Sequence, residues 1–196
     1  MGRRNDHSSE EFDQMVLQAA WGHLQENSAD SLSLRKLAGL IGYAPSTLVS
    51  TYGSYSLLLL RVNGHTLELL AQALAPDPQL PPREQLLHLA LGYLQFARQH
   101  PHAFRLVFEH KMPQSQGLPV SFTRQLEGLF GRIEGPLAAL QPGLARDHLK
   151  LYARTLWASV HGICLLDIDD KLFFEGGDGQ AMVATLLGQM LDKEPS

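Results

Sequence analysis

Apolar residues recur at intervals of three and four along nearly the whole chain, and this helical period is the strongest constraint on the fold. No segment alternates apolar and polar residues for long enough to indicate a β-strand. The pattern therefore predicts an all-α protein. In residues 9–27, one helical face collects the apolar side chains Phe12, Met15, Val16, Ala19, Ala20 and Leu24.

Capping residues and prolines set the expected ends of the helices. Ser8 or Ser9 suits an N-cap, and Pro45 suits the first position of a helix. The prolines within residues 76–82 cannot continue a helix and mark the expected boundary between two parts of the chain. The expected helices are 9–27, 33–40, 45–51, 54–75, 83–99, 101–110, 119–140, 145–167 and 179–193.

Composition places the chain in a reducing compartment. Cys164 is the single cysteine among 196 residues, which excludes an internal disulfide and a cysteine-based zinc site. The opening MGRRNDHSSEEF lacks the apolar run of a secretory signal, so we expect a cytoplasmic protein. Residues 37–60 lack Lys, Arg, Asp and Glu, but their glycines, proline and hydroxyls argue against a membrane helix, so we expect a soluble chain with no membrane partner.

The second and third expected helices are joined by a short turn containing Gly42, which is the layout of a helix-turn-helix. The segment 31–48, SLSLRKLAGLIGYAPSTL, resembles the signature of the TetR family of one-component transcriptional regulators. HPHAFRLVF at 100–108 and WASVHG at 157–162 resemble the ligand-binding half of a branch with a Trp-x-x-x-His-Gly pattern. The resemblance covers most of the chain and implies a helix-turn-helix domain at 1–53, a connecting helix at 54–75, and a helical ligand-binding and dimerisation domain at 83–196.

The resemblance implies a repressor that binds operator DNA as a homodimer and is released by a small apolar or aromatic ligand. The chain departs from the family at two DNA-contacting positions: Val49 replaces a common Tyr, and Tyr55 stands where a Lys touches phosphate. The expected DNA contacts are Arg3, Arg4, Arg35, Lys36, Pro45, Ser46, Thr47, Ser50 and Tyr52.

The net negative charge of the chain leaves an alternative to DNA binding open. The chain carries a net charge of −4, and residues 1–60 hold four cations against six acids, whereas DNA-binding domains neutralise phosphates with Lys and Arg. One hypothesis retains DNA binding through neutral hydrogen bonds and a few cations. The other is a TetR-like helical dimer that binds a small molecule or a protein without binding DNA.

Aromatic residues of the larger part indicate an effector pocket, although each also suits an ordinary core position. Trp157, His161 and Cys164 share one helical face, and His161 fits a core or interface role as well as a ligand contact. A ligand bound there would shift the dimer from its DNA-competent state through the helix at 54–75. The expected pocket residues are Tyr93, Phe96, Phe104, Phe108, Phe130, Trp157, His161 and Cys164.

The last two expected helices are apolar on more than one face, which indicates burial by both a core and a partner. We therefore expect a homodimer, as the resemblance also implies. The expected interface residues are Leu156, Val160, Ile163, Met182, Leu186, Leu187 and Met190.

Catalytic and metal sites are not indicated. His102 and His110 lie two helical turns apart, too far to share one ion. The acidic run 167–170 has Lys171 where a calcium loop needs a ligand, and Gly176–Gly179 lacks the Lys-Ser/Thr ending of a phosphate loop. We expect no metal, no cofactor and no enzymatic activity.

Overall fold

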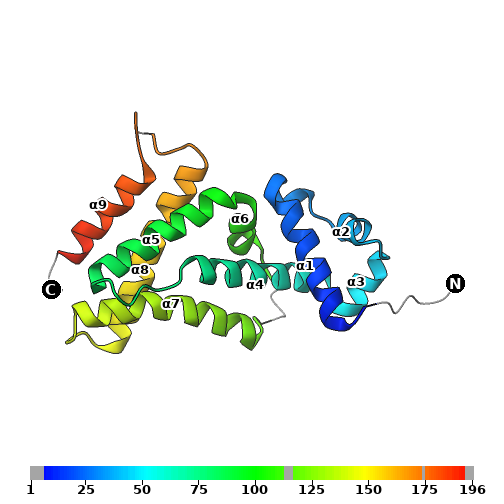
Figure 1. Cartoon of the computed structure of the whole chain (residues 1–196), viewed down its shortest axis with the longest axis horizontal. Coiled ribbons are helices and arrows are strands. Elements are labelled where there is room, and N and C mark those ends of the chain that lie inside the picture. Colours follow the sequence, from blue (N-terminus) through cyan, green and yellow to red (C-terminus); the bar gives the residue numbers. More distant parts are fainter. Residues whose placement is uncertain (1–6, 113–116, 174, 193–196) are drawn as a thin grey trace. The chain divides into compact units, whose positions relative to one another are not determined.

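The computed structural model describes residues 7–112, 117–173 and 175–192, which form nine α-helices and one short 3₁₀ helix, η1 (Ala29–Ser31), without a β-strand (Figure 1). The predicted all-α class is confirmed, and the helix ends lie within two residues of their expected positions. The helices are α1 (Ser9–Glu26), α2 (Leu34–Ile41), α3 (Pro45–Tyr52), α4 (Tyr55–Ala73), α5 (Pro82–Gln99), α6 (Pro101–Glu109), α7 (Val120–Leu140), α8 (Arg146–Ile168) and α9 (Gly179–Leu191).

Side-chain caps explain where the first two helices begin. The Ser8 hydroxyl accepts a hydrogen bond from the Glu11 backbone N–H at 3.2 Å, and the Glu11 carboxylate accepts one from the Ser8 N–H at 2.6 Å. These bonds to Ser8 lower the pKa of the Glu11 carboxyl. At α2, the Ser33 hydroxyl accepts from the Lys36 N–H at 3.1 Å. Both caps satisfy backbone donors that the first turn leaves unpaired.

The uncharged window 37–60 contains two sharp breaks rather than one long helix. Gly42 and Gly53 follow α2 and α3 with φ angles of 74° and 83°, in the region that favours glycine. Among the described residues, no helix combines the length and apolar character that crossing a bilayer requires.

One compact unit comprises residues 1–67 and 102–118. It contains α1 to α3, the first part of α4, and α6. α6 belongs here because Ala103 and Leu106 are buried in the same core as the apolar faces of α1 and α2. The core side chains are Phe12, Val16, Leu17, Ala20, Leu24, Leu32, Leu37, Ala38, Leu48, Leu58, Val62, Ala103 and Leu106.

Polar contacts also attach α6 to α4 inside this first unit. The Asn63 side-chain amide, 1% exposed, donates to the Leu106 carbonyl at 3.3 Å. The Ser56 hydroxyl lies 2.9 Å from Nε2 of His110. The compact units therefore divide α4 near residue 67 and assign α6 to the N-terminal unit, which differs from the division expected at the prolines of 76–82.

The second unit comprises residues 68–101 and 119–196. Its central helix α5 packs against α7, α8 and α9, and α8 also packs against α7 and α9. The buried side chains repeat every three or four residues, as the sequence pattern predicts. They include Leu86, Leu89, Tyr93, Leu94, Leu137, Ala153, Leu156, Val160, Cys164, Val183 and Leu187.

An ion-pair cluster fastens α5 to α8 and to the start of α9. Nε and Nη2 of Arg98 donate to the two carboxylate oxygens of Asp167 at 2.6 and 2.8 Å. Nη2 of Arg98 also lies 3.3 Å from Oδ1 of Asp178, whose side chain caps α9. Gly179 permits this arrangement, because a Cβ added there would lie 2.4 Å from Oδ1 of Asp167.

Candidate nucleic-acid interface and effector site

The turn between α2 and α3 contains three residues. Gly42 takes the left-handed conformation, and the Tyr43 N–H donates to the Ala38 carbonyl at 3.0 Å, which closes the end of α2. Ala44 is extended and Pro45 is the first residue of α3. The local geometry is the helix-turn-helix layout that the sequence predicts.

Helix α3, the second helix of the helix-turn-helix, has one buried and one exposed face. Leu48 is fully buried in the core of the first unit, and Thr47 is half-buried. The Thr51 hydroxyl donates back to the Thr47 carbonyl at 3.0 Å. The exposed face offers hydroxyl and small apolar groups and no cation: Pro45, Ser46, Val49, Ser50 and Thr51.

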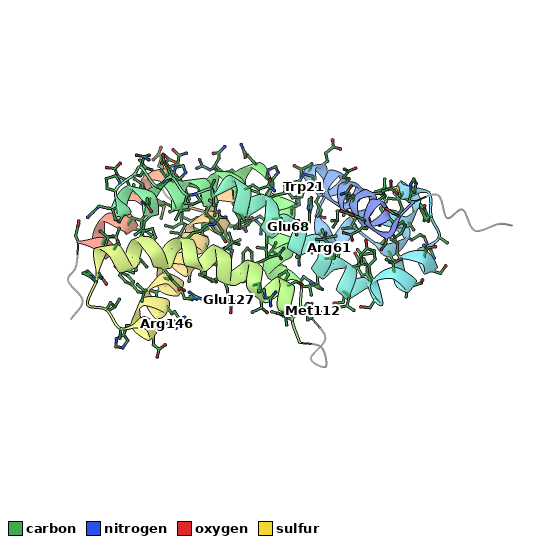
Figure 2. The ribbon with its side chains drawn as sticks, turned by 60° about the horizontal axis from the view of Figure 1, so that its bottom comes forward. Trp21, Arg61, Glu68, Met112, Glu127 and Arg146 are labelled. Atoms are coloured by element: carbon green, nitrogen blue, oxygen red, sulfur yellow. The ribbon has the colours of Figure 1, made fainter. Side chains whose placement is uncertain are left out.

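Tyr52, the last residue of α3, turns its hydroxyl toward the inside of the unit. This hydroxyl donates to Oδ1 of Asp13 on α1 at 2.8 Å, and Arg61 of α4, marked in Figure 2, donates to Oδ2 of the same carboxylate. Burial, and then the hydrogen bond to Asp13, raises the pKa of Tyr52. The sequence places Tyr52 among the DNA contacts, whereas its hydroxyl is engaged by Asp13.

The predicted cationic contacts lie in two places. Arg35 and Lys36 are exposed in the first turn of α2. Backbone N–H groups and the helix dipole also favour an anion at a helix N-terminus. Arg3 and Arg4 lie outside the described residues.

Tyr55, which the family resemblance places at a phosphate-binding Lys position, makes a hydrogen bond within the first unit. Its hydroxyl donates to the Leu32 carbonyl, which fastens the start of α4 to the segment before α2. Burial raises the pKa of this half-buried phenol. The family resemblance points to a missing Lys at this position, but the sequence carries no signal for the contact between Tyr55 and a carbonyl 23 residues away.

In the second unit, α5 and α8 bring together three of the predicted pocket residues. The Trp157 indole N–H donates to the Tyr93 hydroxyl oxygen at 3.2 Å, and that oxygen lies 3.0 Å from Nδ1 of His161. The Trp157 and His161 rings stack at 5.4 Å and 24°. Burial lowers the pKa of His161, which favours a neutral ring whose Nδ1 accepts a hydrogen bond from the Tyr93 hydroxyl.

The aromatic cluster continues onto α7 and ends at an ion pair. Phe130 meets Trp157 edge-to-face at 5.5 Å, and the Arg154 guanidinium lies 3.8 Å from the centre of the Phe130 ring. Arg154 also pairs with Glu134. Arg154 and Glu134 are not among the residues predicted from the sequence, although Arg154 lies one turn before Trp157 on the same face of α8.

The remaining predicted pocket residues divide between the two units. Phe96 and Cys164 are buried in the second unit, and burial followed by the charge of Asp167 raises the pKa of Cys164 to about 12. Phe104 and Phe108 belong to the first unit, where their rings pack at 5.3 Å. Neither unit therefore contains the whole predicted set.

The predicted dimer residues differ widely in exposure within the protomer. Leu156, Val160 and Leu187 are at most 4% exposed, so their own core leaves them almost no surface for a partner. Ile163, Leu186 and Met190 are half-buried, and Met182 is 37% exposed. Two exposed leucines of α8 are not among the predicted interface residues: Leu151, 66% exposed, and Leu166, 42% exposed.

The acidic segment 167–170 takes part in an ion pair and in the turn that follows α8. Asp167 pairs with Arg98, and Asp170 follows α8 with a left-handed φ of 55°. Within the described ranges, no three His, Cys, Asp or Glu side chains gather as a metal site requires.

Comparisons with known proteins agree with this architecture. No curated protein matches the chain. Among solved structures, a protein of unknown function from Rhodococcus sp. RHA1 aligns with a TM-score of 0.75 at 19% identity, over 97% of both chains. A TetR-family regulator from Streptomyces coelicolor aligns with a TM-score of 0.69 at 16% identity, over 94% of this chain and 80% of that one. BioQ, solved with its natural double-stranded DNA operator, aligns with a TM-score of 0.67 at 18% identity, over 92% and 98% of the two chains.

These structural likenesses show the fold. A family model described as the tetracyclin repressor-like C-terminal domain matches residues 86–190, more than half of the chain. The protein therefore belongs to the TetR family of transcriptional regulators, a family of non-enzymes.

Proposed function

We propose that the protein is a cytoplasmic repressor that binds operator DNA as a dimer through α3 and is released by a small apolar or aromatic ligand. The observation that carries this proposal is the exposed face of α3, which presents Ser46, Val49 and Ser50 after a tight turn while Leu48 fixes the opposite face in the core. A short exposed helix of this kind fits the major groove. The DNA complex of the structural neighbour BioQ supports the same use of this fold.

The exposed residues suit neutral recognition supported by a few charges. Ser46 and Ser50 offer hydroxyls to bases or phosphates, and Val49 offers methyl groups to a thymine. Arg35 and Lys36 would neutralise phosphates at the N-terminus of α2. Arg3 and Arg4 are proposed, from the sequence alone, to reach a minor groove.

The cluster of Tyr93, Trp157, His161 and Phe130 is the proposed effector site. Its rings favour a flat apolar ligand, and the Tyr93–His161 hydrogen bond supplies polar atoms that could orient it. Induction requires the ligand to bind better to the conformation that does not bind DNA. Cluster residues on α5, α7 and α8 would transmit that preference through α4 to the first unit.

The dimer is proposed to form through α8 and α9. Their outer faces expose Leu151, Leu166 and Met182, which are apolar side chains that a partner would cover. Leu156, Val160 and Leu187 support these faces from beneath rather than making the contact. Sedimentation of the protein as a monomer at micromolar concentration would contradict this part of the proposal.

Charge favours a second candidate, a helical dimer that binds a ligand or protein without DNA. Residues 1–60 carry two more acids than cations, and α3 contributes no cation. The two candidates share the effector cluster and the dimer, so only a DNA-binding measurement separates them.

Fluorescence anisotropy with a labelled duplex from the intergenic region beside the protein's own gene tests DNA binding. We expect saturable binding about tenfold or more tighter than to a scrambled duplex of equal length. The variant R35A/K36A should weaken binding to both duplexes. The matched control R83A/R124A removes two exposed cations from α5 and α7 of the second unit, outside the helices proposed for the dimer contact, and should leave binding to both duplexes unchanged. Failure to bind either duplex at low salt would refute the repressor proposal and favour the second candidate.

Tryptophan fluorescence tests the effector site. The chain has two tryptophans, so W21F leaves Trp157 as the single emitter. A panel of aromatic and aliphatic carboxylic acids, esters and hydrocarbons would be titrated with and without DNA. A ligand of the cluster should change Trp157 emission and release the duplex at the same concentration. A ligand that releases DNA while leaving Trp157 emission unchanged would place the effector site elsewhere.

A further inference from the structure

One carboxylate of the first unit joins three helices. Asp13 lies on α1, and its Oδ1 accepts a hydrogen bond from the Tyr52 hydroxyl of α3 at 2.8 Å. Its Oδ2 accepts from Nε and Nη2 of Arg61 on α4 at 3.1 and 2.8 Å. The Asp13 side chain is 26% exposed, so these contacts are partly shielded from water. Charge-assisted bonds of this kind are shorter and stronger than neutral ones.

α3 has two anchors on the face that packs inward. Leu48 and Tyr52 are four residues apart, and therefore lie one above the other on the same face of the helix. The apolar contact of Leu48 has no preferred direction, so it does not fix the orientation of α3. The hydrogen bond of Tyr52 is directional and does fix that orientation. Gly53 follows at a φ of 83° and ends the helix, so Tyr52 is the last point at which α3 is held.

The orientation of α3 matters more here than it would on a cationic helix. Coulomb attraction falls slowly with distance and tolerates a displaced charge, but a neutral hydrogen bond weakens steeply with a change of length or angle. The exposed face of α3 carries hydroxyls and no cation. Recognition through Ser46 and Ser50 therefore depends on how the helix is held.

We propose that Asp13 is a positioning residue for operator recognition, which sets the orientation of α3 through Tyr52 and is itself fixed by Arg61. The inference rests on the proposed DNA-binding function. Asp13 acts without touching DNA, and its carboxylate favours specific binding although its charge repels phosphates.

This last point separates positioning from simple electrostatics. If Asp13 acted only as a charge, removing it would tighten DNA binding, as removal of any acid near DNA does. If Asp13 positions α3, its removal weakens binding to the operator alone. Asp30, exposed in η1, provides the matched acid for comparison.

The test compares D13A, D30A and Y52F with the wild-type chain. Anisotropy is measured with the operator duplex and with a scrambled duplex, and amide hydrogen exchange of residues 46–52 is measured in the free protein. We expect D13A to weaken operator binding about tenfold, to leave scrambled-duplex binding unchanged or tighter, and to speed exchange in α3. Y52F, which keeps the ring and the net charge, should weaken operator binding about threefold, and D30A should weaken neither duplex.

Three results would overturn the proposal: equal effects of D13A and D30A, equal losses for the two duplexes, or unchanged exchange in α3 of D13A. If D13A does not fold, the same three comparisons are made with Y52F in its place, and the same results would overturn the proposal. If the wild-type chain does not distinguish the operator from the scrambled duplex, the proposed function fails. Hydrogen exchange then still decides whether Asp13 holds α3: faster exchange in D13A supports the anchor, and unchanged exchange overturns it.

Discussion

Replacing Gly179 with Ala should destabilise the second unit, although the same change usually stabilises a helix. The added Cβ would lie 2.4 Å from Oδ1 and 2.9 Å from Cγ of Asp167. Asp167 cannot move freely, because Arg98 holds both of its carboxylate oxygens. Relief of the clash therefore requires that the carboxylate leave its position between α5 and α9.

The size of the effect follows from the bonds that would be lost. A hydrogen bond to a charged group contributes about 1.5–3 kcal/mol, and the lower end applies because Arg98 is about one-third exposed. Replacing Gly by Ala near the start of a helix stabilises the helix by less than about 1 kcal/mol, which offsets part of this loss. We expect a net loss of about 1 kcal/mol, which lowers the melting temperature by about 2–4 °C in a chain of this size.

Thermal and urea denaturation measure the change against a matched variant. Gly188 lies in the same helix, and a Cβ there meets no atom within 4 Å, so G188A should be neutral or stabilise by up to about 1 kcal/mol. In an R98A background, G179A should cost less than it does alone, because the bond it breaks is already absent. Equal stability of G179A and G188A would refute the reasoning.

Three further predictions concern the first unit. The proposed dimer brings four cations to DNA from Arg35 and Lys36 and up to four more from Arg3 and Arg4, so the logarithm of operator affinity should fall with the logarithm of salt concentration with a slope between about −4 and −7. A slope steeper than about −8 would reveal further cations. L48A should lower the free energy of unfolding by about 3 kcal/mol in urea, because Leu48 is fully buried, and a loss below about 1 kcal/mol would contradict that burial. Burial lowers the pKa of His110, so the neutral form is favoured in the fold and stability should decline as the pH falls through about 6.5. Urea denaturation at pH 7.5 and 5.5 measures this decline, which should be smaller in H110Q.

Helix ends were predictable because the signals that set them are local. Ser33 caps α2 three residues from the N–H that it binds, and Pro45 begins α3 without any long-range contact. The left-handed turn at Gly42 is likewise a property of a single residue. The short turn of the helix-turn-helix follows from these neighbours in sequence.

Membership of α6 in the first unit could not be read from neighbours in sequence. The prolines of 76–82 are a clear local break, yet the core of the first unit is completed by Ala103 and Leu106 from beyond it. The amide of Asn63 finds its carbonyl partner 43 residues away. A Pro-rich segment marks where a helix stops, and packing decides which core the next helix joins.

The predicted dimer residues show a second point that the sequence pattern does not decide. A helix that is apolar on several faces indicates burial on more than one side, but the pattern does not say which face meets the core. Leu156 and Val160 share the face that the protomer buries, whereas Leu151 and Leu166 stand exposed. Exposure in the folded chain is needed to separate the two faces.

In the count of charges over residues 1–60, Asp13 is one of the six acids that repel the phosphates of DNA. In the fold its carboxylate is neutralised by Arg61, which lies one position beyond that window, so residues 1–61 carry one excess acid rather than two. The Glu11 carboxylate likewise accepts a hydrogen bond from the Ser8 N–H in the first turn of α1, where the helix dipole favours an anion. Part of the excess negative charge is therefore engaged in contacts within the first unit, and one of these acids, Asp13, is bonded to α3 through Tyr52. Because the exposed face of α3 carries no cation, we infer that its affinity for DNA depends on how accurately the helix is held, and that Asp13 contributes to that accuracy although its charge repels phosphate.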